Sequence, residues 1–580
     1  MVFPVDALKR LVAIASLLSA LSLLGGCASL GSLGGGNGEP PFGTYLAARH
    51  AASAHETEKA ADLYAKSLRQ NPDDPVVLER GFMLYAATGD MNHAVPLARE
   101  LIKTKPDHRL ARLVLGIVDI KNRDYADAKD QFAKSEPGPF TALIGSLTSA
   151  WAEAGLKDRQ GALDRLATFD GRASFDLFRY FHQALILDEL EDVKGAEAAY
   201  RKANDVSSGA SIRVIEAYVS FLVRQERPDE ARTLLTQYLT LAPTHPLALA
   251  DLDRLDKGRS FDPLVANPAE GVAEVLYGLG SALTQDSNSD LSSLYLNMAL
   301  YMRPDFDVAR MLLATTYEQA KRWNEAIALF KQIDSDSPLY QTARIQAATD
   351  LERLGKEDEA IAELSRITSS NTADTEPVVS LGDIYRAKED FPKAAETYTR
   401  ALKMIGEPTE REWTLLYARG ICYERMGQWD KAETDLKKAL ELSNENPLVL
   451  NYLGYSWIEQ GVHLDEAVGM IEKAVEQRPN DGFIVDSLGW ARYRLGDYGQ
   501  AVEYLERAAE LEPGDPTINE HLGDAYWHVG RRIEARFQWS HALDMKPEQK
   551  RLEPLRAKLD FGLKPELDIE AVSPPKADQS

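Results

Sequence analysis

Apolar and small residues recur in this chain with a period of 34 positions, most clearly in two consecutive copies, 482–515 and 516–549. The copies share small residues at the eighth, twentieth and twenty-seventh offsets and a proline at the thirty-second: Gly489, Ala501, Ala508 and Pro513 in the first, Gly523, Ala535, Ala542 and Pro547 in the second. Small residues let two antiparallel helices approach closely, and proline ends the second helix because its nitrogen cannot donate a hydrogen bond. The pattern therefore predicts one helical hairpin in each copy.

The same template fits 14 segments of the chain. They begin near residues 41, 75, 109, 141, 177, 212, 273, 307, 341, 375, 413, 447, 482 and 516. Two copies depart from it, since the copy at 141 has a displaced second helix and the copy at 447 has one extra residue. The pattern resembles the tetratricopeptide repeat. Hairpins of this kind bury their apolar faces by stacking, so the resemblance implies an all-α fold, a tetratricopeptide-repeat right-handed α-solenoid of about 14 hairpins.

The repeat pattern is interrupted at 246–272, where a first helix is followed by a loop that contains glycine and prolines. Two interpretations fit this interruption. It is either a joint between an N-terminal array at 41–245 and a C-terminal array at 273–549, or a decayed fifteenth repeat packed in line with the others.

The residues after the last repeat predict a closing element. Residues 549–561 can form an amphipathic helix, and the last repeat needs one because its apolar face would otherwise meet water. Residues 564–580 have the composition of a disordered tail. We therefore assign 550–580 to a capping helix and a disordered tail.

The start of the chain has the pattern of a cleaved secretory signal. Lys9 and Arg10 precede an uncharged apolar run of 14 residues, 11–24. This run is shorter than the roughly 20 residues that a membrane-spanning helix needs. The sequence Leu-Gly-Gly-Cys at 24–27 resembles the lipobox of bacterial lipoproteins. An ordinary signal peptide followed by a chance cysteine is the alternative.

The lipobox resemblance implies that residues 1–26 are a lipoprotein signal peptide and that Cys27 is lipidated after their removal. The acyl chains form a durable anchor, because each buried methylene contributes roughly 0.8 kcal/mol. Residue 28 is Ala and not Asp. By resemblance to lipoprotein sorting, this favours the bacterial outer membrane, with the protein facing the periplasm. Residues 27–40 comprise the lipidated cysteine and a Gly/Ser-rich flexible tether, which averages roughly 20 Å end to end.

The charge balance excludes some classes of partner. The 580 residues include 66 Lys and Arg against 90 Asp and Glu, a formal net charge of −24. This excess of acid argues against nucleic acid as a partner, and against docking on anionic lipid through a basic patch. The only cysteines are Cys27 and Cys422, so neither a disulfide scaffold nor a cysteine-rich zinc module is available. We expect Cys422 in the core.

The sequence lacks the motifs HExxH, GxSxG and CxxC, and a GxxxxGK phosphate-binding loop followed by Ser or Thr. His521, His528 and His541 lie in the last copy, but no carboxylate cluster completes a metal site there. Carboxylate pairs are too common in so acidic a chain to indicate a catalytic site. We therefore expect no enzymatic activity, no metal, no cofactor and no small-molecule substrate.

In the tetratricopeptide repeat family, the first helices line a concave groove through fixed offsets of the repeat. By this resemblance, a partner-binding groove would include Tyr455, Trp490, Tyr493, Arg494 and Trp527. Aromatic side chains favour binding because they bury a large area at low entropy cost. The alternative is that some of them pack between adjacent first helices as ordinary core. A clamp for a peptide carboxylate is not expected, because Arg494 is the only cation at the groove offsets of the last three copies.

The lipobox, the tether and the array, with blocks such as 450–455 and 486–490, resemble a family of lipoprotein adaptors. These adaptors bind a periplasmic carboxyl-terminal processing protease and deliver peptidoglycan hydrolases to it. The resemblance implies a non-catalytic protein-binding scaffold whose partners are a periplasmic protease and cell-wall hydrolases. Docking enzyme and substrate on one tethered scaffold raises their effective concentration. An alternative is a component of outer-membrane protein assembly or of polysaccharide export, which would form a stable complex with a β-barrel protein.

Overall fold

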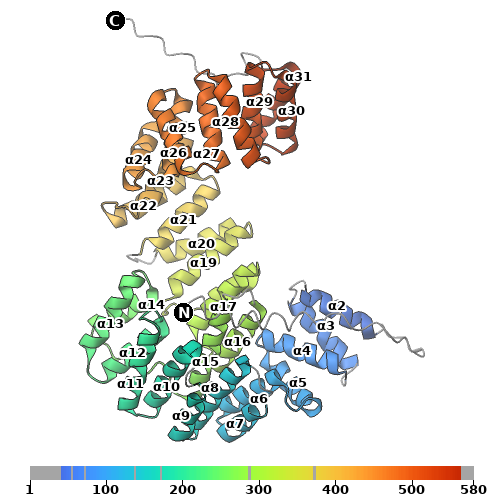
Figure 1. The fold of residues 1–580 in the computed structure, drawn as a ribbon, viewed down its shortest axis with the longest axis vertical. Helices are drawn as coiled ribbons and strands as arrows, with labels where there is room; N and C mark the ends of the chain where they lie inside the picture. The colour runs from blue at the N-terminus through green and yellow to red at the C-terminus, as the bar shows by residue number, and fades with distance from the viewer. Residues whose placement is uncertain are drawn as a thin grey trace, which may run out of the picture. The chain divides into compact units, whose positions relative to one another are not determined.

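The computed structural model describes residues 41–53, 57–70, 74–135, 139–169, 173–284, 289–369 and 374–563. The predicted signal peptide, Cys27, the tether and the tail at 564–580 lie outside these ranges. Within them the chain forms thirty α-helices and one short 3-10 helix, with no β-strand (Figure 1). Consecutive helices pair as hairpins, so the prediction of an all-α solenoid is confirmed.

The contacts between residues divide the chain into two compact units, Met1–Ala360 and Ile361–Ser580. The segment 246–272, where the sequence predicts a joint, lies inside the first unit. The compact units therefore do not coincide with the two predicted arrays. Helix α20, Glu357–Ser369, crosses the division.

The first unit consists of helical hairpins together with the short helix η1. Its described elements are α2 Pro41–Ser53, α3 Thr57–Gln70, α4 Pro75–Ala87, α5 Met91–Thr104, α6 Arg109–Asn122, α7 Tyr125–Ala133, α8 Pro139–Gly155, α9 Arg159–Ala167, η1 Ala173–Phe175, α10 Asp176–Glu189, α11 Val193–Val206, α12 Ile212–Arg224, α13 Pro228–Leu241, α14 Pro246–Asp256, α15 Pro268–Leu283, α16 Ser289–Met302, α17 Asp307–Gln319, α18 Trp323–Phe330 and α19 Tyr340–Arg353.

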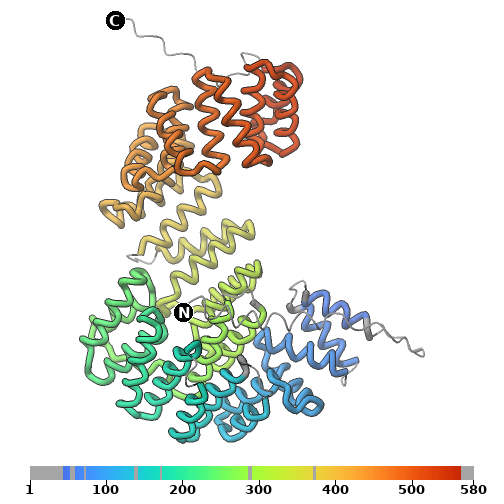
Figure 2. Tube along the Cα trace, in the orientation of Figure 1, coloured from blue at the N-terminus to red at the C-terminus, as the bar shows by residue number. Residues whose placement is uncertain are grey.

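In the second unit, the hairpins follow one another side by side along the chain (Figure 2). The described helices are α21 Glu376–Ala387, α22 Phe391–Ile405, α23 Trp413–Arg425, α24 Trp429–Leu442, α25 Pro447–Gln460, α26 Leu464–Gln477, α27 Gly482–Arg494, α28 Tyr498–Leu511, α29 Pro516–His528, α30 Arg532–Asp544 and α31 Gln549–Phe561. The helix expected over 549–561 is present as α31, which packs on α30.

The hairpin of α29 and α30 shows why the repeat needs its small and large residues. A Cβ atom added to Gly523 would lie 2.5 Å from Nε1 of Trp539, so only glycine allows this approach of the two helices. The Trp539 side chain is fully buried, and its ring nitrogen donates a hydrogen bond to Asp524 at 2.8 Å. The eighth position of the repeat thus receives the large side chain of the twenty-fourth.

Helices α15 and α16 form the interior of the first unit. Helix α15 packs against α6, α8 and α10, and α16 packs against α4. Figure 1 shows both helices inside the arc made by the preceding hairpins. Fourteen of the 16 residues of α15 are buried, so this helix is in contact with protein on all sides. A helix that is apolar all round belongs in a core.

The loop that interrupts the repeat also packs into the first unit. Its Phe261 and Val265 side chains are buried, and Ser220 donates a hydrogen bond to the carbonyl oxygen of Asp262 at 2.6 Å. A buried ion pair joins Arg213 of α12 to Glu274 of α15. These contacts hold the segment 246–272 and the following helix inside this unit.

Two carboxyl groups meet between α17 and α19. Glu318 and Asp350 both lie near Arg353, whose Nη1 is 3.9 Å from Oε1 of Glu318 and 3.1 Å from Oδ1 of Asp350. Burial raises the pKa of both carboxyl groups, and the charge of Asp350 raises that of Glu318 further, to about 7. Glu318 therefore binds its proton more tightly in the folded chain than in the unfolded chain.

This carboxyl pair predicts a pH dependence of stability. The folded-state pKa of Glu318 is raised from 4.5 to about 7, so protonated Glu318 favours the folded state. This contribution to the free energy of unfolding is complete below pH 4.5 and is lost as the pH rises through 7. Glu318→Gln should reduce this slope and stabilise the first unit by about 1–2 kcal/mol at pH 8, while burial of Asp350 keeps part of the slope. Thermal unfolding between pH 4.5 and 8 measures it. Glu325→Gln, at a more exposed carboxylate, should keep the wild-type slope. An unchanged slope in Glu318→Gln would contradict the prediction.

Candidate protein-binding surfaces

The structure brings the four predicted groove aromatics into one hydrophobic cluster in the second unit, but it buries two of them. Trp490 and Tyr493 are 1% and 2% exposed, whereas Tyr455 and Trp527 are partly buried at the edge of the cluster. The rings of Trp490 and Tyr493 stack with centroids 4.6 Å apart. The open groove position expected for Trp490 and Tyr493 is thus replaced by packing between helices, which is the alternative that the sequence left open.

The neighbouring repeat causes this burial. His521 of α29 stacks on Trp490 with ring centroids 4.0 Å apart, and its Nδ1 lies 3.0 Å from the carboxylate of Asp486 on α27. Trp490 in turn donates its ring N–H to Glu459 of α25 at 2.9 Å. The Trp490 side chain of α27 therefore lies between side chains of α25 and α29, the first helices of the repeats before and after it.

Arg494, the predicted groove cation, is also paired within the array. Its Nη1 donates to Oε1 of Glu459 at 3.0 Å, and its side chain is mostly buried. Glu459 thus accepts hydrogen bonds from both Trp490 and Arg494. Binding of a partner by the five predicted residues stays a prediction. In this structure Trp490 and Arg494 link adjacent first helices, whereas Trp527 packs against Trp539 of α30.

The capping helix α31 packs against α29, the first helix of the last repeat. Lys558 of α31 reaches Glu520 and Asp524 of α29, with Nζ 2.8 Å from Oε1 and 2.6 Å from Oδ2. Arg551 also donates to Glu520, at 2.8 Å. All of Lys558, Glu520 and Asp524 are buried. At this end of the array, the chain's own α31 takes the place that a further repeat would occupy.

Burial and charge compete in this cluster. Burial opposes the charge of Lys558, but the carboxylates of Asp524 and Glu520 outweigh it and raise the Lys558 pKa. Burial raises the pKa of Asp524. Burial also opposes the charge of Glu520, but Lys558 and Arg551 lower its pKa overall. The cluster is therefore stable only while the lysine and the carboxylates are together.

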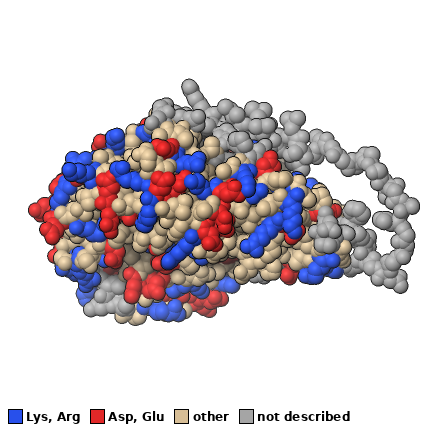
Figure 3. All heavy atoms as spheres, turned by 90° about the horizontal axis from the view of Figure 1, so that it is seen from below, with Lys and Arg blue, Asp and Glu red and all other residues tan. Residues whose placement is uncertain are grey.

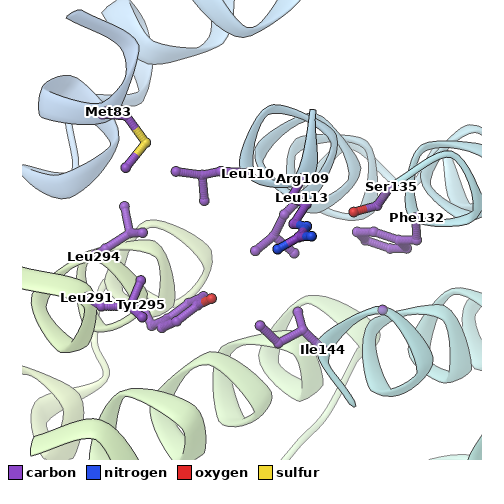
Figure 4. A pocket seen from close by; sticks show the side chains of 11 residues that line it. Met83, Arg109, Leu110, Leu113, Phe132, Ser135, Ile144, Leu291, Leu294 and Tyr295 are labelled. Atoms are coloured by element: carbon purple, nitrogen blue, oxygen red, sulfur yellow. The ribbon is translucent and has the colours of Figure 1, made fainter. Parts of the chain in front are cut away.

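An open apolar pocket lies in the first unit (Figure 4). It has a volume of about 230 Å³ and is lined mainly by residues of α4, α6, α7, α8 and α16. Arg109 is the charged residue in its lining. Figure 4 shows side chains from these helices pointing into a common space. The lining residues are Met83, Arg109, Leu110, Leu113, Phe132, Ser135, Ile144, Gly145, Leu291, Leu294 and Tyr295.

A second pocket of about 470 Å³ adjoins the first, since both are lined by Met83, Leu291 and Leu294. The sequence pattern does not predict this site, because it forms where α16 meets α4. Asn297 of α16 donates a hydrogen bond to the carbonyl oxygen of Ala87 at 2.8 Å, a contact between residues 210 positions apart. A repeat pattern reports contacts between neighbouring hairpins and gives no signal for such a pair.

No group of three or more His, Cys, Asp or Glu side chains in the described part of the chain is placed to hold a metal ion. Cys422 is buried, and burial raises the pKa of its thiol to about 11.

No helix among the described residues is long and apolar enough to cross a membrane. Lys and Arg are interspersed with Asp and Glu over the face seen in Figure 3.

Three segments of the second unit match family profiles described as tetratricopeptide repeat, at 378–412, 413–446 and 487–543. The chain contains tetratricopeptide repeats. This finding confirms the repeat type that the sequence pattern predicts.

Curated relatives match parts of the chain. TPR repeat-containing protein PA4667 of Pseudomonas aeruginosa is 26% identical over 196 residues, which are 34% of this chain and 32% of that protein. BBSome complex member BBS4 of Bos taurus is 33% identical over 108 residues, 19% of this chain and 20% of that protein. The chain thus spans about a third or less of the length of these relatives. Among solved structures, the APC/C hetero-tetramer Cut9–Hcn1 has 15% identity, a TM-score of 0.38, and coverage of 90% of this chain and 96% of that one.

Proposed function

We propose that this protein is a non-catalytic scaffold that binds other proteins and is held at the outer membrane, on the periplasmic side, by lipid on Cys27. The tetratricopeptide repeats support the binding of protein partners. The observation that carries the proposal is the open apolar pocket between α4, α6, α8 and α16. An apolar surface left open in a well-packed array favours a partner that supplies the missing apolar side chains.

The finer proposal concerns the partners. The resemblance of the lipobox, tether and array to lipoprotein adaptors supports a periplasmic protease and cell-wall hydrolases as the proteins brought together. The scaffold then acts by proximity, because two proteins docked on one tethered chain meet at a much higher effective concentration than free proteins do. The chain's own residues supply docking surfaces in this mechanism and no chemical step.

Crosslinking of the tagged protein in intact cells, followed by mass spectrometry of the membrane fraction, tests the partner proposal. Recovery of a protease together with cell-wall hydrolases would support it. Recovery of neither would argue strongly against it, and a stable complex with a β-barrel protein would favour outer-membrane assembly or export instead. Cys27→Ala should release the protein from the membrane fraction, and retention of that variant in the membrane would contradict the lipid anchor.

The pocket makes its own prediction. Met83→Asp places a carboxylate at a position that lines both pockets and is 39% exposed, so it should reduce capture of the pocket's partner by about tenfold or more while leaving melting nearly unchanged. Quantitative crosslinking yields measure this loss. Val193→Asp, a matched control at an exposed valine of α11 in the same unit, should capture wild-type amounts. Equal yields from both variants would rule the pocket out as the docking site.

A further inference from the structure

The second helix of the last repeat carries two large apolar side chains at positions where the preceding repeat has none. Ile533 and Phe537 of α30 are 86% and 65% exposed, and they lie one helical turn apart. Ile533 has the largest exposed fraction among the large hydrophobic residues that the structure describes. The same two offsets hold Gly499 and Glu503 in the preceding repeat.

These two side chains are not needed to hold α30 in place. The face of α30 that packs into the array is formed by Ala535, Trp539 and Ala542, all of them fully buried. Ile533 and Phe537 point away from that face. Two large apolar residues in water, at positions that the fold leaves free to be polar, indicate a surface used for binding.

Two arginines flank the exposed pair. The guanidinium carbons of Arg532 and Arg536 lie 5.0 and 5.9 Å from the centroid of the Trp527 ring. Neither forms an ion pair with a carboxylate of the described chain, in contrast to Arg531, which pairs with Glu506 and Glu534. The positive charge of Arg532 and Arg536 is therefore available to a ligand.

The end of the array also differs in charge from the rest of the second unit. Residues 374–530 contain 16 Lys and Arg against 30 Asp and Glu, whereas 531–563 contain eight against five. A basic end on an acidic array attracts acidic ligands to that end and disfavours their binding elsewhere on the unit.

We propose that Ile533 and Phe537, flanked by Arg532 and Arg536 and here termed the terminal ridge, dock an acidic amphipathic helix of a partner protein. Apolar side chains one turn apart on that helix pack around Ile533 and Phe537, and its flanking Glu or Asp residues pair with the two arginines. This inference deepens the proposed scaffold function and rests on it, since it assigns a partner chemistry to one surface of the array.

Fluorescence anisotropy with the mature chain tests the terminal ridge. The probe is a fluorescein-labelled synthetic helix with Leu on one face and Glu at the flanking positions, and the control peptide has Lys in place of Glu. The Glu peptide should bind about tenfold or more tightly than the Lys peptide, and its affinity should fall as salt increases. Equal affinity for the two peptides would overturn the proposal.

Variants locate the binding. Ile533→Ser with Phe537→Ser should weaken binding of the Glu peptide by about tenfold or more, and Arg532→Gln with Arg536→Gln by about three- to tenfold. Phe483→Ser, at another exposed aromatic residue of this unit, should bind as wild type does. The melting temperature of all variants should stay near that of wild type, because these side chains are exposed. Unchanged binding in the Ile533 and Phe537 variant would overturn the assignment.

Other occupants of the terminal ridge are separate outcomes of the same experiment. A dimer of the mature chain that dissociates in the Ile533→Ser and Phe537→Ser variant would assign the ridge to a second copy and overturn the proposal. So would a tenfold gain in peptide affinity on deletion of residues 564–580, which would assign it to the chain's own tail. If membrane crosslinking recovers partners equally with wild type and with this variant, the scaffold function stands and the ridge assignment fails.

Discussion

Replacing Lys558 with Met is expected to detach α31 from the second unit. The substitution keeps the apolar stem of the side chain but leaves the buried carboxylates of Glu520 and Asp524 without the ammonium that lies 2.8 and 2.6 Å from them. Removing one partner of a buried ion pair typically costs about 3–5 kcal/mol, because the remaining charge stays desolvated. We therefore expect the cap to open before the rest of the array, since repeats unfold as neighbouring units rather than all at once.

Hydrogen exchange of the backbone amides measures this opening. Amides of α29, α30 and α31 should exchange much faster in Lys558→Met than in wild type, while those of α21 to α24 stay unchanged. The loss of stability caused by Lys558→Met should be larger at pH 8 than at pH 5. Burial already raises the pKa of Asp524, so an unpaired Asp524 protonates as the pH falls and the buried charge disappears.

Arg556→Met is the matched control on the same helix. Its ion pair with Glu553 is exposed at both ends, so the variant should stay within about 0.5 kcal/mol of wild type. Lys558→Met combined with Asp524→Asn should recover part of the stability, because the second change removes the carboxylate that has lost its cation, while Glu520 keeps Arg551. Wild-type exchange in Lys558→Met would show that the ion pairs do not hold the cap.

The 34-residue pattern predicts the helical hairpins well because it encodes local contacts. Gly523 and Trp539 occupy the small and large positions of one hairpin, and the structure brings them into contact. A pattern of this kind reports the approach of two helices joined by a short turn. The helices and their pairing therefore follow from spacing alone.

The burial of Trp490 and Tyr493 could not be predicted from the sequence for a different reason. The offsets place Trp490 and Tyr493 on the correct helix face and in one cluster with Tyr455. The offsets do not indicate how much of that face is covered by the first helix of the following repeat. His521 of the following repeat stacks on Trp490, and burial depends on this neighbour rather than on the spacing within one repeat.

The interior of the first unit lies beyond the reach of the repeat pattern altogether. Helices α15 and α16 meet α8 and α4, hairpins from which they are separated by more than a hundred residues. The available signal was the run 271–283, which is apolar or small except for Glu274 and Ser281, and such a run is typical of a helix buried on all sides. The terminal ridge is the opposite case, because Ile533 and Phe537 stand out only by comparison with the same offsets of the preceding repeat, which hold Gly499 and Glu503.

The packing of α15 against α8 leads us to expect a large loss of stability when Gly271 is replaced by alanine. A Cβ atom added to Gly271 would lie 2.2 Å from the ring of Trp151, which is fully buried and donates its ring N–H to His182 at 3.2 Å. Gly271→Ala therefore forces the indole or the helix to move, and overpacking of this kind costs about 1–3 kcal/mol and occasionally more. We expect a net loss near the upper end of that range, even though alanine favours the helix by about 1 kcal/mol over glycine.

Urea unfolding followed by tryptophan fluorescence measures the loss, and the emission of Trp151 should shift to the red if the indole is displaced. Gly145→Ala is the matched control in α8, since an added Cβ there meets open space and should stabilise the helix by about 0.5–1 kcal/mol. A stability of Gly271→Ala equal to wild type would contradict the packing of α15 on α8.

A double-mutant cycle separates the clash from other effects of the alanine. Trp151→Leu alone removes a buried indole and should cost about 3 kcal/mol or more, because it leaves a cavity in the core. In the presence of Trp151→Leu, however, Gly271→Ala should cost nothing or even stabilise, since the smaller side chain leaves room for the new methyl group. A coupling of about 2 kcal/mol between the two positions would show that α15 lies directly against α8. Additive losses would mean that Gly271 is required for some other contact, and that the interior of the first unit is not organised around this pair.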